Sequence, residues 1–351
     1  MENDRVRDVT WPKVAIIILN WNGWRDTIEC LESLQRLTYP NYQIIVVDNG
    51  STDDSMEKIK AWVESTNITV YYCKLAPHEV NAKIGQLKQY ISGLNKSLSS
   101  ITIIQIDENL GFARGNNIGI KFAIEVYDPE FVVVLNNDTY VEPDFLFPLI
   151  EAFFKYPSVG AVGPRIVDYG HQTVWFGYFT ERPGFLSLAI GHRLSRIFHN
   201  HRRKRLPSEW SQDRIVYAIP GTCMVFSRQT LQLIHGFDEA TFLYWEEFII
   251  AEKLANYNMK TYFVPDSCIY HKWEASSKNL AKARQFIENM KSEFYYFERY
   301  RNITAIQFAI LKMLRLAIYA YRCLLYANYR KHWLEFIAVI LSRSDFYERR
   351  T

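Results

Sequence analysis

The stretch FVVVLNNDT places three polar side chains directly after an apolar run. Residues 131–135 have the composition of a strand buried on both faces, and Asn136, Asn137 and Asp138 follow at once. A hard cation such as Mg²⁺ or Mn²⁺ that bridges diphosphate oxygens needs only one or two protein carboxylates. Asp138 can supply one, and Asn136 can add a neutral oxygen. The same order of residues is also common turn chemistry, so both interpretations stay open at this point.

Two earlier apolar runs, residues 14–19 and 43–48, also end on polar groups. The polar side chains at these ends are Asn20 and Asn22, then Asp48, Asn49 and Ser51. A carboxylate at a strand end, beside a Gly/Ser turn that begins a helix, can accept hydrogen bonds from a base or from ribose hydroxyls. The N-terminus of that helix favours phosphate. Capping by Ser51 or Asp53 explains the turn equally well, but it does not explain Asp48.

The stretch ENLGFARGNNIGIKFA combines regularly spaced glycines with one arginine. Gly111, Gly115 and Gly119 lie four residues apart, unlike the glycines of a dinucleotide fingerprint or a phosphate loop. This spacing fits close packing of a helix. It also fits the close approach of a diphosphate to Arg114, and the spacing alone does not choose between them.

Two further segments carry groups that can transfer protons or bind a metal. In FLYWEEFIIAEKL, Glu246 and Glu247 follow an aromatic cluster and begin an amphipathic helix. The helix dipole favours glutamates there, but aromatic surroundings also raise a carboxyl pKa toward the range of a general base. In VPDSCIYHK, His271 follows a short strand, and only a partner would make it a metal ligand.

A sheet is needed to bring these strand ends together. Continuous apolar, β-branched runs alternate with helical segments up to about residue 140, which predicts an α/β fold with a parallel or mixed sheet covered by helices on both faces. Ligands of such sheets bind at the carboxyl ends of the strands. From residue 160 to 271 the chain is richer in aromatic residues and glycine, which predicts a second lobe with antiparallel strands and long loops.

Composition excludes several classes of protein. A net charge of +3 on 351 residues gives no indication of nucleic-acid binding. Five scattered cysteines without a CxxC pair argue against a disulfide framework or a zinc site and fit a reducing cytosol. No signal peptide and no clear spanning helix is expected. The first strand is not followed by GxGxxG, which argues against a nicotinamide-dependent oxidoreductase.

Taken together and in this order, these segments resemble family 2 glycosyltransferases of the GT-A fold, in particular their bacterial rhamnosyltransferase-like branch. The matching segments are VAIIILNWNG, IIVVDNGSTDDS, ENLGFARGNNIG, VVVLNNDT, GTCMVFSR, GFDEATFLYWEE and YFVPDSCIYH. The resemblance covers about residues 12–273. It implies a GT-A domain at 12–275, with a nucleotide-sugar-binding half at 12–140 and an acceptor half at 160–275.

The resemblance also implies roles for single residues. The nucleotide-sugar site is expected to comprise Asn20, Asn22, Asp48, Asn49, Ser51, Asn109, Arg114, Asn136 and Asn137, with Asp48 contacting the base. Asn136-x-Asp138 matches the DxD-type metal motif with Asn in the first position, and His271 matches a histidine that completes the metal site in several relatives. Asp138 and His271 are therefore the expected ligands of Mg²⁺ or Mn²⁺. Glu247 falls at the position of the general base, with Glu246 as the alternative.

The implied reaction is inverting, metal-dependent transfer of a sugar from a nucleotide-diphosphate donor, dTDP-rhamnose or a UDP-sugar. The acceptor would be a glycan or a polyprenyl-diphosphate-linked sugar in cell-surface polysaccharide assembly. The metal and Arg114 would stabilise the leaving group while the base deprotonates the acceptor hydroxyl. The substitutions at Asn136 and Glu247 leave an alternative, a catalytically inactive GT-A subunit that serves as a binding partner in a glycan-assembly complex.

Residues 276–351 are predicted to be helical and to associate with a membrane. One helical face carries Lys312, Arg315, Tyr319, Arg322 and Tyr326, and another carries Leu311, Leu314, Ile318 and Leu325. Such a pattern predicts an amphipathic helix in the membrane plane, with packing on the catalytic lobe as the alternative. The basic cluster at 199–205 would meet anionic lipid or a lipid-linked diphosphate, unless it is a solvated loop. The expected location is cytoplasmic, peripheral on the inner face of the cell membrane.

Overall fold

The structure is a computed structural model of the chain. It describes residues 11–66, 68–76, 79, 83–86, 88, 100–170, 174–175, 179–191, 202–203, 208–272 and 282–342. Apart from the short strand Arg202–Arg203, the basic cluster at 199–205 lies outside the described residues.

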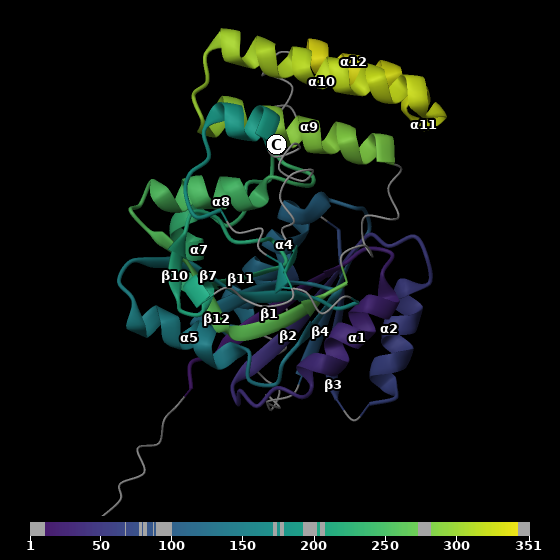
Figure 1. Ribbon diagram of the computed structural model, residues 1–351. Helices are drawn as coiled ribbons and strands as arrows, with labels where there is room; N and C mark the ends of the chain where they lie inside the picture. The colour runs from purple at the N-terminus through teal and green to yellow at the C-terminus, as the bar shows by residue number, and fades with distance from the viewer. Residues whose placement is uncertain are drawn as a thin grey trace, which may run out of the picture.

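One large mixed sheet forms the centre of the molecule (Figure 1). Its main strands run in the order β10-β12-β7-β11-β5-β1-β2-β4-β3. The parallel strands are β1 (Val14–Asn20), β2 (Tyr42–Asn49), β3 (Thr69–Leu75), β4 (Ser100–Ile106) and β5 (Phe131–Asn136). The α/β fold predicted from the alternating apolar runs is confirmed.

The second part of the chain extends the same sheet. Its strands are β6 (Thr139–Val141), β7 (Val159–Asp168), β8 (Val174–Trp175), β9 (Arg202–Arg203), β10 (Arg214–Val216), β11 (Cys223–Ser227) and β12 (Lys260–His271). β11 joins β5 in antiparallel orientation, but β12 runs parallel to β7, so the expected antiparallel lobe is only partly correct. β12 lies parallel to β7 because the chain crosses back through a helix between them, as parallel pairing requires.

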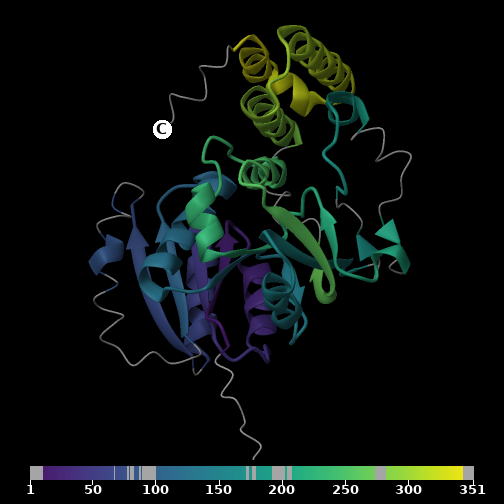
Figure 2. The ribbon, with the colours of Figure 1, turned by 90° about the vertical axis from the view of Figure 1, so that its left-hand side faces the viewer.

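Helices cover both faces of the sheet (Figure 2). The helices α1 (Trp24–Leu34), α2 (Ser55–Glu64) and α4 (Gly111–Phe122) pack with the strands β1–β5, and η2 (Ala123–Tyr127) continues α4. The helix α5 (Leu146–Lys155) packs mainly against β7 and β12. Those of the second part are α7 (Arg228–Ile234) and α8 (Glu246–Ala255), with the short turns η3 (Ser187–Gly191) and η4 (Ser208–Trp210). Alternate residues of β1 enter opposite cores: Ile17 packs with α4, and Ile16 packs with α1.

A helical layer follows the sheet domain and lies over α8 (Figures 1 and 2). It consists of α9 (Lys282–Tyr300), α10 (Ala305–Leu325), α11 (Ala327–Lys331) and α12 (Trp333–Leu341). A third apolar core joins these helices to Phe248 and Ile249 of α8. The predicted C-terminal helical extension is therefore confirmed. Among the helices that the structure describes, none is long and apolar enough to cross a membrane.

The middle of the basic and tyrosine stripe of α10, Arg315 and Tyr319, points inward, while Tyr326 at its end is 56% exposed, which corrects the predicted orientation of this helix. Arg315 is 2% exposed, donates through Nε to Glu293 of α9 at 2.5 Å and donates to the Ala189 carbonyl at 3.0 Å. Tyr319 is fully buried and stacks on Phe336 with ring centroids 3.8 Å apart. A buried charge needs a partner, and Glu293 provides one, so this stripe can form the packed side of the helix.

Candidate active site

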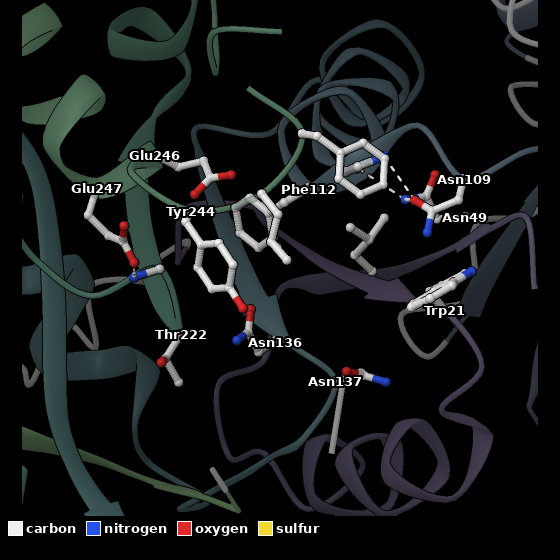
Figure 3. A pocket seen from close by; sticks show the side chains of 15 residues that line it. Trp21, Asn49, Asn109, Phe112, Asn136, Asn137, Thr222, Tyr244, Glu246 and Glu247 are labelled. Carbon is white, nitrogen blue, oxygen red and sulfur yellow. Dashed lines mark hydrogen bonds between the residues drawn. The ribbon is translucent and has the colours of Figure 1, made fainter. Parts of the chain in front are cut away.

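A pocket lies at the carboxyl ends of β1, β2 and β5 (Figure 3). It is lined by Leu19, Trp21, Asn49, Asn109, Gly111, Phe112, Asn136, Asn137, Gly221, Thr222, Phe242, Leu243, Tyr244, Glu246 and Glu247. The strand ends meet there because Asn20 pairs with Asp48 and Leu19 with Asn136 in register. Within this lining, the two glutamates are the only acidic residues, and no lysine, arginine or histidine is present.

Asn49 fixes the wall of the pocket that precedes α4. Its Nδ2 donates to the Asn109 Oδ1 and to the Gly111 carbonyl, both at 3.0 Å, and its Oδ1 accepts from the Leu110 N–H at 3.0 Å. Asn109 Oδ1 also accepts from the Gly111 N–H at 2.9 Å. The amides of Asn49 and Asn109 are therefore held in place at the edge of the pocket, as Figure 3 shows.

Asp48 lies behind this wall and is not among the lining residues. It is fully buried, and its Oδ1 accepts from Asn20 Nδ2 at 2.7 Å and from Ser51 Oγ at 2.5 Å. Burial raises the pKa of Asp48, and these donors oppose the rise. Ser51 Oγ in turn accepts from the backbone N–H of Asn22 at 2.9 Å. Asp48 thus ties together the turns after β1 and β2, while its neighbour Asn49 reaches the pocket.

The glycines of α4 are needed at their positions for different structural reasons. A Cβ on Gly115 would lie 2.6 Å from Leu19 Cδ1, and one on Gly119 would lie 2.6 Å from Ile17 Cγ2, so both permit close packing of α4 on β1. Gly111 has a φ of +82°, and a Cβ there would lie 2.4 Å from the Phe242 carbonyl oxygen. Arg114 points to Glu239, with Nε 3.5 Å from the carboxylate, and does not line the pocket.

Asp138 and His271 come together from distant parts of the chain. β6 pairs with the end of β12 so that Thr139 faces His271, and the Asp138 Oδ1 lies 3.0 Å from the His271 Nε2. Both side chains are buried, and neither is among the residues lining the pocket, whereas Asn136 and Asn137 are. Lys272 fixes this strand end by donating to Asp26 at 2.9 Å and Glu29 at 2.6 Å.

The Asp138–His271 pair offers two adjacent atoms of the kinds that ligate divalent cations. A carboxylate oxygen and an imidazole nitrogen already lie side by side, and a cation could replace the hydrogen bond between them. In the described parts of the chain, no group of three or more His, Cys, Asp or Glu side chains is arranged around a common metal position. Substrate oxygens or water would complete the coordination, as Mg²⁺ sites with few protein ligands require.

The two glutamates begin α8 after a strained turn. Tyr244 and Trp245 both have a φ of +74°, a left-handed conformation that is rare for aromatic residues. Glu247 Oε1 accepts from the Gly221 N–H at 3.2 Å. Burial raises the pKa of Glu247, and the N–H groups of Glu247 and Gly221 oppose the rise. Burial and the adjacent Glu247 carboxylate raise the pKa of Glu246 to about 8.

The lining includes several residues to which the sequence analysis gave no role. Trp21 lies between Asn20 and Asn22, and Thr222, Phe242 and Tyr244 lie in segments that resemble the family but carried no predicted role. Phe242 is fixed by its carbonyl, which accepts from the Phe112 N–H at 2.8 Å. An aromatic residue directly after a buried strand was the signal available for Trp21.

A family model described as "Glycosyltransferase like family 2" matches residues 12–286, and the chain belongs to this family. It is accordingly a glycosyltransferase, with the GT-A fold class expected from the resemblance, and both predictions are confirmed.

Curated relatives include the N-acetylglucosaminyl-diphospho-decaprenol L-rhamnosyltransferase of Mycobacterium tuberculosis, 24% identical over 273 residues that cover 76% of this chain and 78% of that protein. The poly-beta-1,6-N-acetyl-D-glucosamine synthase of Staphylococcus epidermidis is 26% identical over 155 residues, 44% of this chain and 29% of that protein. A similar solved structure is a mannosyltransferase from Pyrobaculum calidifontis in complex with GDP-Man and Mn²⁺, with 17% identity, a TM-score of 0.48 and coverage of 95% of this chain and 86% of that one.

Proposed function

We propose that this glycosyltransferase moves a sugar, with inversion, from dTDP-rhamnose or a UDP-sugar to a hydroxyl of a glycan or polyprenyl-diphosphate-linked acceptor in cell-surface polysaccharide assembly. The observation that carries the proposal is a single pocket with an aromatic side chain and fixed amides at one side and a glutamate pair at the other (Figure 3). Residues 12–140 would hold the donor, and residues 160–275 would hold the acceptor. The rhamnosyltransferase relative supports a lipid-linked acceptor through its name.

The donor's base would lie against Trp21, beside the amides of Asn49 and Asn109. These three line the same side of the pocket at the ends of β1 and β2 and before α4. An indole ring offers an apolar face for stacking, and the fixed amides offer polar atoms at the ring's edge. Asn20, Asn22, Asp48 and Ser51 would act indirectly, through the hydrogen bonds that hold the two turns.

A Trp21→Ala variant is expected to bind dTDP or UDP about 5- to 150-fold more weakly, because stacking of a base on an aromatic ring contributes about 1–3 kcal/mol. Isothermal titration with the nucleoside diphosphate measures the change. Trp62→Ala is the control, since Trp62 lies on α2 and donates to Glu32 outside the pocket. Equal affinities of Trp21→Ala and the wild type would contradict the stacking role.

Glu247 would act as the base. The Gly221 N–H orients its carboxylate toward the pocket, where it takes the proton of the acceptor hydroxyl. The acceptor oxygen then bonds to the anomeric carbon as the bond to the nucleoside diphosphate breaks on the opposite face. Asp138 and His271 would hold Mg²⁺ or Mn²⁺, which supplies positive charge for the leaving diphosphate. To reach that diphosphate, Arg114 would have to leave Glu239.

A panel of dTDP-, UDP- and GDP-sugars, each with Mg²⁺ or Mn²⁺, tests the proposed function. We expect nucleotide release from a dTDP- or UDP-sugar, accelerated by a polyprenyl-diphosphate-linked sugar acceptor. Binding without turnover of every donor would instead support the inactive GT-A subunit. Turnover of GDP-sugars alone would contradict the proposed donor class.

The helical layer would place the enzyme on the inner face of the cell membrane, next to a lipid-linked acceptor. Three apolar side chains of α10 point outward: Ile306 is 74% exposed, Met313 70% and Leu324 80%. Leu334 and Leu341 of α12 are exposed as well, and so are the basic residues Arg330 and Lys331 of α11. An apolar helix face beside basic side chains is typical of helices that bind anionic membranes in the interfacial plane.

A Met313→Glu/Leu324→Glu variant is expected to bind anionic liposomes at least about tenfold more weakly, because each buried large apolar side chain contributes about 1.5–3 kcal/mol. Flotation with phosphatidylglycerol-containing vesicles measures this. Phe154→Glu is the control, since Phe154 is 72% exposed but lies on α5. Equal flotation of the double variant and the wild type would contradict membrane binding through α10.

A further inference from the structure

Glu246 has a carboxyl group whose chemistry the proposed reaction does not use. The side chain lines the pocket and is 5% exposed. Its Oε1 is buried and has no hydrogen-bond partner among the residues that the structure describes. Glu247, the next residue, differs because its Oε1 accepts from the Gly221 N–H. The two neighbouring carboxyl groups therefore occupy unequal environments.

An ionised Glu246 would be costly in this position. A buried carboxylate needs donors for its oxygens, and an oxygen without a donor keeps the full desolvation penalty. A second carboxylate beside it adds repulsion, so only one member of such a pair readily ionises. The fixed Gly221 N–H favours ionisation of Glu247. The proton shared by the pair consequently belongs on Glu246.

We infer that Glu246 stands in the resting pocket as a neutral carboxylic acid and donates its O–H to a hydroxyl oxygen of a sugar bound there. This inference rests on the proposed function, because it requires that a sugar enters the pocket. Glu246 thereby becomes a sugar-recognition residue, and Glu247 remains the base. A site built to hydrogen-bond a substrate hydroxyl discriminates strongly against sugars that lack it.

The groups around Glu246 support its assignment as the neutral acid and that of Glu247 as the ionised base. Burial and the Glu247 carboxylate raise its pKa to about 8, while the backbone N–H groups of Glu246 and Tyr244 oppose the rise. The lining residues contributed by β2, the β5 end and the segment before β11 are the neutral Asn49, Asn136 and Thr222, and Tyr244 contributes a phenol. No lysine, arginine or histidine lines this described pocket, so no cation there favours the ionised form.

The pH dependence of kcat/KM follows from the raised pKa of Glu246. The neutral form of Glu246 predominates below about pH 8 and is lost as the pH rises through that value. The wild-type kcat/KM is therefore expected to fall above about pH 8. In Glu246→Gln the side chain is neutral at every pH and still carries a donor, so this fall should disappear.

Two variants of Glu246 separate hydrogen bonding from shape. Glu246→Gln is expected to keep kcat/KM within about fivefold of the wild type at pH 7, whereas Glu246→Met should lose about tenfold or more because its side chain donates no hydrogen bond. A loss in donor hydrolysis without acceptor assigns the hydroxyl to the donor sugar. A loss only in the acceptor KM assigns it to the acceptor. Equal losses in both variants, or no loss in either, would overturn the inference.

Infrared spectroscopy tests the protonation state without any substrate. At pH 7 the wild type should show the carbonyl band of a buried carboxylic acid, which vanishes in Glu246→Gln and titrates at a lower pH in Glu247→Gln, where the neighbouring carboxylate is gone. Persistence of the band in Glu246→Gln together with its loss in Glu247→Gln would overturn the assignment. A wild type that shows the band but consumes no donor would contradict the proposed function alone, so the two failures are distinguishable.

Discussion

Glu247→Gln is expected to lower kcat by about 10²–10⁴-fold, the usual contribution of a positioned general base. The amide has nearly the same shape, and its carbonyl oxygen can still accept from the Gly221 N–H, so the start of α8 should not move. What the variant loses is the capacity to take the acceptor proton. Affinity for the nucleotide should stay within about twofold, because Trp21 and the amides lie at the other side of the pocket.

The control for this variant is Glu57→Gln, an exposed glutamate in the first turn of α2. The pH profile of the wild-type activity supplies a second check on the role of Glu247. The pKa of Glu247 is raised above the usual value, so the active, ionised base should be lost as the pH falls through that raised pKa. A Glu247→Gln variant that keeps more than about a third of the wild-type kcat would contradict its role as the base.

Asp138→Asn is expected to weaken Mn²⁺ binding and to lower transfer by at least about 100-fold, since a bound cation contributes several kcal/mol of charge stabilisation. The amide keeps the volume and can remain bonded to His271, so the melting temperature should change little. Mn²⁺ binding is measured by electron paramagnetic resonance in the presence of the nucleoside diphosphate. This readout does not depend on turnover.

Asp144→Asn serves as the matched control, because Asp144 is exposed in the turn before α5. For the wild type, chelation with EDTA should abolish transfer, and added Mn²⁺ should restore it. Asp138→Ala tests the same site without a polar side chain and should also stay folded, since its partner His271 is held in the β12 ladder. Undiminished activity of either variant in EDTA would contradict a metal-dependent reaction.

The sheet and the position of its ligand site could be predicted because they depend on local composition. Continuous β-branched runs define parallel strands, and the polar residues at their ends must lie on one edge. The sequence alone could not show which of the two neighbours, Asp48 or Asn49, faces the pocket. Adjacent strand residues point to opposite faces, and without the register the side that faces the pocket is unknown. In the structure, Asn49 reaches the pocket and Asp48 holds the turns behind it.

The predicted orientation of α10 was wrong for a different reason. Basic residues at helical spacing normally face solvent, but Arg315 has a buried partner 22 residues earlier in the chain. Glu293 and the Ala189 carbonyl become neighbours of Arg315 only after α9, η3 and α10 have packed together. The pairing of Asp138 with His271, 133 residues apart, was anticipated through the resemblance, since spacing alone gives no sign of it.

The anomeric configuration of the transferred sugar tests the central claim most directly. In the proposed reaction one base, Glu247, faces a donor held at the ends of β1, β2 and β5, which implies a single displacement at the anomeric carbon. Proton NMR of the product formed from the accepted donor should show the anomeric configuration opposite to that of the donor. A product that retains the donor's configuration would contradict single displacement and, with it, the role given to Glu247.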